Sequence, residues 1–201
     1  MIKTIIADDH PMILKGLEMM LSSSKKFDVV AVASNGNELI DAASNKKADL
    51  ILIDYRMPLL NGIEAIDAIR KKCNTRLVLV TNYADDWLVE KAKKIGADGI
   101  VCKSEEESMI LMKLYKVIAG EKMFPSKQEI YNRLYEPLKK AYKLTDSETN
   151  TIKEINNGLG VKEIAKKNFL SPETVKSHKK SAFEKLGINK MTLLSKLLNR
   201  L

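Results

Sequence analysis

The sequence predicts an α/β domain with a five-stranded parallel sheet, followed by a small domain made only of helices. In residues 1–120, five short apolar runs alternate with amphipathic stretches of helical length, whereas no strand-like run follows residue 144. The charge divides in the same way, because residues 1–120 are neutral and the whole excess of +8 lies in residues 121–201. This asymmetry favours a regulatory or catalytic module joined to a module that binds a polyanion.

The five apolar runs are rich in Ile, Val and Leu without alternation, which is typical of strands buried on both faces of a sheet. They occupy residues 4–7, 29–33, 50–53, 77–80 and 99–102. The helical stretches between and after them occupy residues 11–22, 37–45, 62–72, 85–95 and 105–119. The alternation predicts right-handed crossovers and helices on both faces of the sheet. In such sheets, ligands bind beyond the carboxyl ends of the strands.

The second half of the chain has a different character. Residues 121–143 contain two prolines and three tyrosines, and we interpret them as a linker that is partly helical. Ser171 followed by Pro172 predicts the start of a helix, and Gly187 predicts its end. The helices of a C-terminal domain over residues 144–201 are predicted at about 146–157, 161–168, 172–186 and 189–200.

Composition excludes several classes of protein. With 45% apolar and 30% charged residues, the chain can fill a core and stay soluble. No apolar run reaches the roughly 18–20 residues of a membrane span. Asp8 and Asp9 come too early for a signal peptide, and Cys73 and Cys102 have no metal-ligand spacing. We therefore expect a cytoplasmic protein with reduced thiols and no membrane partner.

Five chemically distinct side chains follow the predicted strands. Asp8 and Asp9 come after the first strand, Asp54 after the third, Thr81 after the fourth and Lys103 after the fifth. A single acid in such a place is usually a solvated turn residue, so the prediction depends on the convergence of all five. Clustered carboxylates raise the pKa of at least one of them unless a cation binds, and Mg²⁺ prefers such oxygen ligands. Aspartate can also attack phosphorus and form an acyl phosphate.

The first 120 residues resemble the receiver domain of bacterial two-component response regulators, which has a flavodoxin-like fold. The matching residues, in order and spacing, are Asp8-Asp9, Asp54-Tyr55-Arg56-Met57-Pro58, Gly62, Thr81 and Lys103. The resemblance implies that Asp54 is the phosphoacceptor. It also implies that Asp9, Asp54 and the backbone carbonyl of Arg56 hold Mg²⁺, with Asp8 acting through a water molecule.

The same resemblance implies that Thr81 and Lys103 contact the phosphoryl group and that movement of Thr81 carries the signal. Three positions depart from the usual receiver pattern. Ile100 stands three residues before the lysine, where receivers usually have Tyr or Phe, so the usual aromatic rotamer switch is absent. Asn82 replaces a residue that is usually small, which would alter water access to an acyl phosphate. Ser104 replaces a common proline.

The predicted helix over 172–186 has one apolar and one polar side. The apolar side carries Val175, Ala182, Phe183 and Leu186, with His178 at its margin. Lys176 and Lys180 lie one turn apart on the other side, with Ser177 beside them. A solvated basic face is the simplest explanation of this pattern. However, a short helix and a tight connection precede the capped helix, and this arrangement predicts a helix-turn-helix whose second helix enters the major groove.

Residues 144–201 resemble the LuxR-type DNA-binding domain. The matching residues are Leu144-Thr145, Glu148, Gly158, Lys162-Glu163-Ile164-Ala165, Ser171, Thr174-Val175-Lys176-Ser177-His178 and Lys185-Leu186-Gly187. The resemblance implies that Lys176, Ser177 and Lys180 contact base edges or the groove, whereas Lys179 and His178 are weaker candidates for phosphate contacts. Glu148 and Lys162 are assigned to the scaffold. The apolar last helix, with Met191, Leu194, Lys196, Leu197, Leu198 and Leu201, either pairs two such domains or packs in the core.

Together the two resemblances indicate a response regulator of the NarL/FixJ class, and not an enzyme. They imply that a sensor histidine kinase phosphorylates Asp54 with Mg²⁺ bound, and that the active homodimer binds paired half-sites in double-stranded DNA. One alternative is a constitutive DNA-binding regulator whose receiver is a docking module independent of phosphate, and Ile100 keeps it open. An aspartate-based phosphatase would need a second acid where Arg56 stands.

Overall fold

The computed structural model describes residues 1–198, without the side chains of residues 195 and 196. Its contacts divide it into two units, and each is described by itself. The first consists of Met1–Ala84 and Leu88–Pro125, and the second of Asp85–Trp87 and the residues from Ser126 onward. No helix in the described part of the chain is long and apolar enough to cross a membrane.

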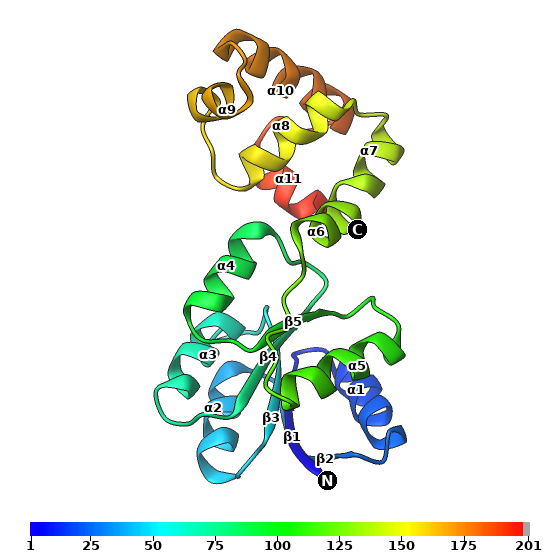
Figure 1. The fold of residues 1–201 in the computed structure, drawn as a ribbon, viewed down its shortest axis with the longest axis vertical. Coiled ribbons are helices and arrows are strands. Elements are labelled where there is room, and N and C mark those ends of the chain that lie inside the picture. The colour runs from blue at the N-terminus through cyan, green and yellow to red at the C-terminus, as the bar shows by residue number, and fades with distance from the viewer. Residues whose placement is uncertain (199–201) are drawn as a thin grey trace. The chain divides into compact units, whose positions relative to one another are not determined.

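The first unit contains one five-stranded parallel sheet with the strand order β2-β1-β3-β4-β5. Its strands are β1 (Ile2–Ala7), β2 (Phe27–Ala33), β3 (Leu50–Asp54), β4 (Arg76–Thr81) and β5 (Gly99–Cys102). Its helices are α1 (Pro11–Ser23), α2 (Gly36–Asn45), α3 (Gly62–Arg70), α5 (Glu107–Ile118) and, from Leu88 onward, α4 (Asp86–Lys94). Helices α1 and α5 cover one face of the sheet, and α2 and α3 cover the other (Figure 1). The predicted α/β fold is confirmed.

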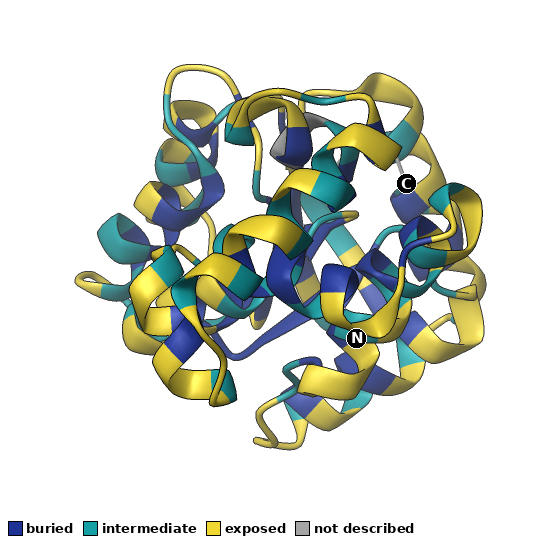
Figure 2. Ribbon diagram, turned by 90° about the horizontal axis from the view of Figure 1, so that it is seen from above, coloured by how far each residue is buried: buried dark blue, intermediate teal, exposed yellow. Residues whose placement is uncertain are grey.

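The apolar runs form the strands, and burial on both faces holds for the central strands but not for the edge strand β2, which buries only Phe27 and Ala33. All five residues of β3 are buried, as is every residue of β5. Figure 2 shows the same contrast over the molecule, with buried strands and with helices that are buried on one side and exposed on the other. Strands β1, β2 and β4 begin one or two residues before the predicted runs, because hydrogen bonding in the sheet continues into its less buried edge.

A glycine fixes the connection from β3 to α3. A Cβ atom at Gly62 would lie 2.3 Å from the backbone oxygen of Asp54, so only glycine fits beside the end of β3. Asn61 caps α3 by accepting hydrogen bonds from the backbone N–H groups of Ile63 and Glu64. The tight turn therefore holds the Asp54 backbone against the start of a helix.

The second unit is entirely helical in its described residues. It contains α6 (Lys127–Leu134), α7 (Glu136–Tyr142), α8 (Asp146–Asn156), α9 (Val161–Asn168), α10 (Pro172–Leu186) and α11 (Met191–Leu198). Ser171 caps α10 by accepting from the Thr174 N–H, and Gly187 ends the helix with a φ of 65°. The predicted start and end of this helix are confirmed. In the segment interpreted as a linker, α6 and α7 bury Ile130, Leu134 and Leu138.

Candidate functional site

The carboxyl ends of β1, β3 and β5 bring two carboxylates and an ammonium group together. The Nζ atom of Lys103 lies 2.5 Å from Oδ2 of Asp8 and 3.0 Å from Oδ1 of Asp54. The Asp8 side chain is completely buried, and those of Asp54 and Lys103 are only 6% and 12% exposed. Strand order explains the meeting, because β1 and β3 are neighbours and only β4 separates β3 from β5. We call Asp8, Asp9, Asp54 and Lys103 the acidic site.

Burial sets the protonation behaviour of this site. Burial raises the pKa of Asp54, and the nearby Asp8 charge adds to the effect, although Lys103 opposes it. Burial would lower the pKa of Lys103, but its hydrogen bond to Asp8 and its attraction to Asp54 raise the value overall. The surroundings therefore favour the charged form of Lys103, whereas burial disfavours the charged form of Asp54 and Lys103 compensates for it only in part. Such a carboxylate is suited to binding a cation.

His10 also belongs to this end of the sheet, and no motif in the sequence predicts a role for it. Its Nδ1 atom lies 2.8 Å from Oδ1 of Asp9 and 3.3 Å from Oδ1 of Asp8. The His10 backbone N–H also donates to Oδ1 of Asp8, at 3.0 Å. Ligand atoms of Asp8, Asp9 and His10 all lie within 4.8 Å of one another, close enough for one ion. The only signal in the sequence was the position of the histidine directly after the two acids.

Arg56 lies beside Asp54 through its backbone. The Arg56 N–H donates to Oδ2 of Asp54 at 3.2 Å. Its guanidinium carbon lies 6.0 Å from the ring centroids of Tyr55 and Tyr83, within the range of cation–π attraction. The Arg56 side chain therefore extends toward these two rings while its backbone lies against the carboxylate.

Thr81 ends β4 near the same edge but makes different contacts. Its buried hydroxyl donates to the Tyr83 carbonyl and accepts from the Tyr83 N–H, both at 3.1 Å. The Lys103 N–H donates to the Thr81 carbonyl at 3.3 Å, which links the two residues through their backbones. Asn82 is exposed, whereas Ile100 is buried within β5.

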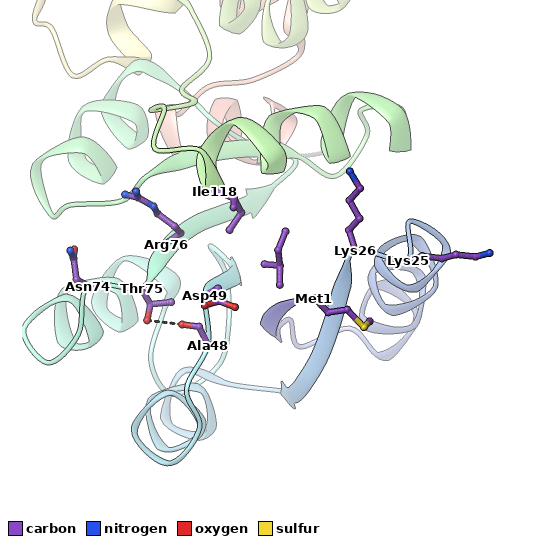
Figure 3. Close-up of a pocket in the computed structure, with 10 residues that line it drawn as sticks. Met1, Lys25, Lys26, Ala48, Asp49, Asn74, Thr75, Arg76 and Ile118 are labelled. Carbon is purple, nitrogen blue, oxygen red and sulfur yellow. Dashed lines mark hydrogen bonds between the residues drawn. The ribbon is translucent and has the colours of Figure 1, made fainter.

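A cavity of about 850 Å³ lies at the other end of the sheet, at the amino ends of β1, β3 and β4. Its lining includes Ile2, Asp49, Arg76 and Ile118, and the Lys25 side chain points away from these (Figure 3). Parallel α/β sheets bind their ligands beyond the carboxyl ends of the strands. The acidic site, not this cavity, occupies that position.

Helix α10 presents the predicted polar face to solvent. Lys176, Ser177 and Lys180 are exposed, whereas Val175 and Ala182 are buried in the domain. The exposed set therefore forms one basic face, as the helical spacing predicts.

The two weaker candidates on α10 are held differently. Lys179 is partly buried, and its ammonium lies 5.4 Å from the ring centroid of Phe183. His178 is also partly buried, and its Nδ1 atom is inaccessible to solvent and has no hydrogen-bond partner among the described residues. Both side chains are therefore less free than Lys176 and Lys180 to reach a ligand.

Glu148 fixes α8 against α10. It accepts hydrogen bonds from Oγ of Ser181 at 2.6 Å, from Nζ of Lys185 at 2.7 Å and from the Thr145 N–H at 2.7 Å. Burial raises the pKa of Glu148, but these hydrogen bonds outweigh burial and lower the pKa to about 2. The scaffold role predicted for Glu148 is confirmed by these contacts.

The last helix, α11, contributes to the core through Leu194 and Leu198, both of which are buried. The Lys196 side chain and Leu201 lie outside the described residues. Packing in the core therefore accounts for part of the apolar content of this helix.

Comparisons with known proteins agree with both units. Residues 4–115 match the family described as "Response regulator receiver domain", and residues 142–197 match "Bacterial regulatory proteins, luxR family". The chain is 31% identical over 197 residues to the transcriptional regulatory protein YdfI of Bacillus subtilis, covering 94% of this chain and 92% of the relative. It is 33% identical over 193 residues to the nitrate/nitrite response regulator NarL of Escherichia coli K12, covering 92% and 88%.

Among solved structures, the chain resembles RcsB of Salmonella enterica serovar Typhimurium, bound to the promoter rprA in the presence of the phosphomimetic BeF3⁻. The TM-score is 0.60 and the identity is 27%, with 98% of both chains covered. The sheet with its acidic edge, the helix-turn-helix and the relatives that match over nearly the whole chain lead to one assignment. The chain belongs to the two-component response regulators of the NarL/FixJ class, which join a receiver domain to a LuxR-type DNA-binding domain.

Proposed function

We propose that this protein is a transcription regulator whose binding to DNA is controlled by phosphorylation of Asp54. The observation that carries the proposal is the Lys103 ammonium held between the buried carboxylates of Asp8 and Asp54. In this proposal residues 1–120 receive the phosphoryl group, residues 144–201 bind DNA and residues 121–143 connect them. The phosphodonor is a sensor histidine kinase in the cytoplasm.

The transfer is a substitution at phosphorus. An oxygen of Asp54 attacks the phosphorus of a phosphohistidine on the kinase, the P–N bond breaks, and an acyl phosphate forms on Asp54. Lys103, which stays charged in its buried position, donates to a phosphoryl oxygen. Thr81 exchanges its hydrogen bonds with the Tyr83 backbone for one to the phosphoryl group. The movement of Thr81 starts the response.

The residues at the acidic site fit a magnesium ion. Their donors are hard carboxylate oxygens, and the charge on buried Asp54 is incompletely compensated. Asp9, Asp54 and the backbone carbonyl of Arg56 would hold the ion, with Asp8 acting through a water molecule. When bound, Mg²⁺ offsets negative charge on the phosphoryl group during transfer.

In the DNA-binding domain, Lys176, Ser177 and Lys180 contact base edges in the major groove, and Lys179 and His178 lie closer to the phosphates. The exposed face of α10 supports this assignment, since lysine and serine pair with acceptors on base edges. The resemblance to RcsB, which was solved with promoter DNA, supports the same interface. Phosphorylation favours a homodimer, which binds paired half-sites in double-stranded DNA.

One observation favours a second candidate, a constitutive DNA-binding regulator whose receiver serves for docking only. Ile100 is buried at the position of the usual aromatic switch. A response that requires an aromatic side chain to swing is therefore unavailable to this chain.

Intact mass and gel filtration after incubation with acetyl phosphate and Mg²⁺ separate the two candidates. The proposal predicts a single phosphoryl adduct together with a larger species, both absent from an Asp54→Ala control. Absence of the adduct, with tight DNA binding in every sample, would establish the constitutive regulator instead.

A further inference from the structure

Residues 121–125 run beside β5, and we call this segment the strap. Helix α5 is followed by Gly120, whose φ of 100° turns the chain back toward the sheet. The Ile100 N–H donates to the Met123 carbonyl at 2.8 Å, and the Met123 N–H donates to the Asp98 carbonyl at 2.9 Å. The strap is therefore bonded to the edge of the sheet as a parallel bridge.

Side chains hold the strap in this position. Nζ of Lys122 lies 2.8 Å from Oδ1 of Asp98, whose side chain is only 3% exposed, and donates to the Ala97 carbonyl at 3.1 Å. The Met123 side chain packs against the core of the receiver. A Cβ atom at Gly99 would lie 2.6 Å from the Met123 carbonyl oxygen, so the close approach requires glycine. The contact is thus specific at the backbone and at the side chains.

Strand β5 connects the strap to the acidic site. This strand has four residues, and one of its two edges pairs with β4. In that pairing Cys102 lies opposite Thr81, and Ile100 lies opposite Leu79. The strap bonds to the other edge, and Lys103 follows the strand directly. A strand of this length spans only about 13 Å. A shift of its carboxyl end therefore also displaces the residues that bond to the strap.

We propose that the strap reports the phosphorylation state of Asp54 and releases β5 when the site is phosphorylated. The inference rests on the proposed function and deepens it. To follow a phosphoryl group on Asp54, Lys103 must loosen its contact with Asp8, and Thr81 must leave Tyr83. Both movements shift the carboxyl ends of β4 and β5. The backbone bonds of Ile100 then replace the missing aromatic switch, because they join β5 to the residues that lead out of the receiver.

The two strap hydrogen bonds, from Ile100 to Met123 and from Met123 to Asp98, are the contacts that the switched state loses in this proposal. A ligand that selects between two states must interact differently with each, and Lys103 and Thr81 provide that difference. The segment that continues from the strap begins at Ser126, so its release frees the start of the connection to the DNA-binding domain.

Amide hydrogen exchange of the full-length protein, followed by NMR with and without BeF3⁻ and Mg²⁺, tests the strap directly. Bound BeF3⁻ is measured independently by its ¹⁹F signal. We expect the Ile100 and Met123 amides to exchange about tenfold faster or more when the site is saturated. The amide of Ile51, in the centre of the sheet, should not change. Unchanged exchange of both strap amides at saturation would overturn the strap proposal alone, whereas failure of BeF3⁻ to bind would overturn the proposed function and the strap with it.

A Gly99→Ala variant gives a second test, because its methyl group displaces the strap without touching the acidic site. We expect this variant to bind DNA without BeF3⁻ as tightly as the unaltered protein does with it. Lys122→Gln, which removes the ion pair with Asp98 and the hydrogen bond to the Ala97 carbonyl, should shift affinity in the same direction by a smaller factor. Gly16→Ala is the control, because nothing lies within 4 Å of its added methyl group. If Gly99→Ala and Lys122→Gln both fold and require BeF3⁻ as the unaltered protein does, the proposal is wrong.

Discussion

Lys103 lies 3.0 Å from the carboxylate of Asp54, and both side chains are nearly inaccessible to solvent. The charges at this site do not cancel, because Nζ of the same lysine also lies 2.5 Å from Oδ2 of Asp8. One positive charge thus serves two buried carboxylates, and burial raises the pKa of Asp54. This shortage of positive charge is what a metal ion would relieve, and it has measurable consequences for stability.

Replacing Asp54 by Asn should stabilise the receiver in the absence of divalent metal. The pKa of Asp54 is raised in the folded state, so its charged form costs stability above that pKa, and stability rises as the pH falls through it. Asparagine removes the charge at neutral pH and leaves Lys103 paired with Asp8. Calorimetry in EDTA should show a melting temperature a few degrees higher, as expected for about 1 kcal/mol. A lower melting temperature would contradict the proposed charge imbalance.

Replacing Lys103 by Met should have the opposite effect on the same unfolding transition. The substitution leaves Asp8 and Asp54 buried without a cation, and breaking a buried pair in this way typically costs about 3–5 kcal/mol. Added Mg²⁺ should restore part of the loss, since it supplies the missing positive charge. Equal destabilisation with and without Mg²⁺ would argue against a metal at this site.

The C-terminal domain should lose stability in acid through Glu148. Its pKa is lowered from 4.5 to about 2, so its hydrogen bonds stabilise the fold above pH 4.5, and this contribution disappears as the pH falls toward 2. Urea unfolding followed over this pH range should show the decline in the unaltered protein. In a Glu148→Gln variant the curve should be flatter, although stability at neutral pH should be lower. Identical slopes for the two proteins would exclude Glu148 as the cause.

We expect Lys176→Ala and Lys180→Ala each to weaken specific DNA binding by about 1–3 kcal/mol if the lysine contacts bases. If the lysine contacts a phosphate instead, the substitution should lower the slope of log K against log salt concentration by about one. Lys179→Ala should have a smaller effect, because its ammonium lies over the Phe183 ring. Fluorescence anisotropy at several salt concentrations distinguishes these cases. The exposed Lys47 of the receiver provides a charge-matched control. Equal losses for Lys47→Ala and Lys176→Ala would show only a general effect of charge.

The sequence predicted the sheet because β3 and β5 are buried on both faces and so consist of continuous apolar runs. It also predicted that Asp8, Asp54 and Lys103 meet, since parallel strands place their carboxyl ends at one edge. It could not predict that the hydroxyl of Thr81 bonds to the Tyr83 backbone, because that depends on a local turn and not on a pattern. The contacts of His10 with Asp8 and Asp9 could not be predicted from the sequence for the same reason.

The position of the strap and the partners of Glu148 were also not predictable from the sequence, because both depend on contacts between residues far apart in the chain. Residues 121–125 lack an apolar run, and their place beside β5 depends on a backbone bridge and on the Lys122–Asp98 ion pair. The sequence alone therefore indicates only a linker at these residues. Glu148 was recognised as a scaffold residue from its motif, but its partners Ser181 and Lys185 lie more than 30 residues away in the chain. Such pairings become visible only once the helices are placed.

The most direct test of the central claim is the affinity of the full-length protein for DNA with and without BeF3⁻ and Mg²⁺, on a duplex selected in vitro from random sequences. The account predicts that BeF3⁻ tightens binding by about tenfold or more in the unaltered protein and has no effect on an Asp54→Asn variant. Equal affinity of the unaltered protein in both conditions, with BeF3⁻ shown to be bound, would contradict control of DNA binding by the acidic site.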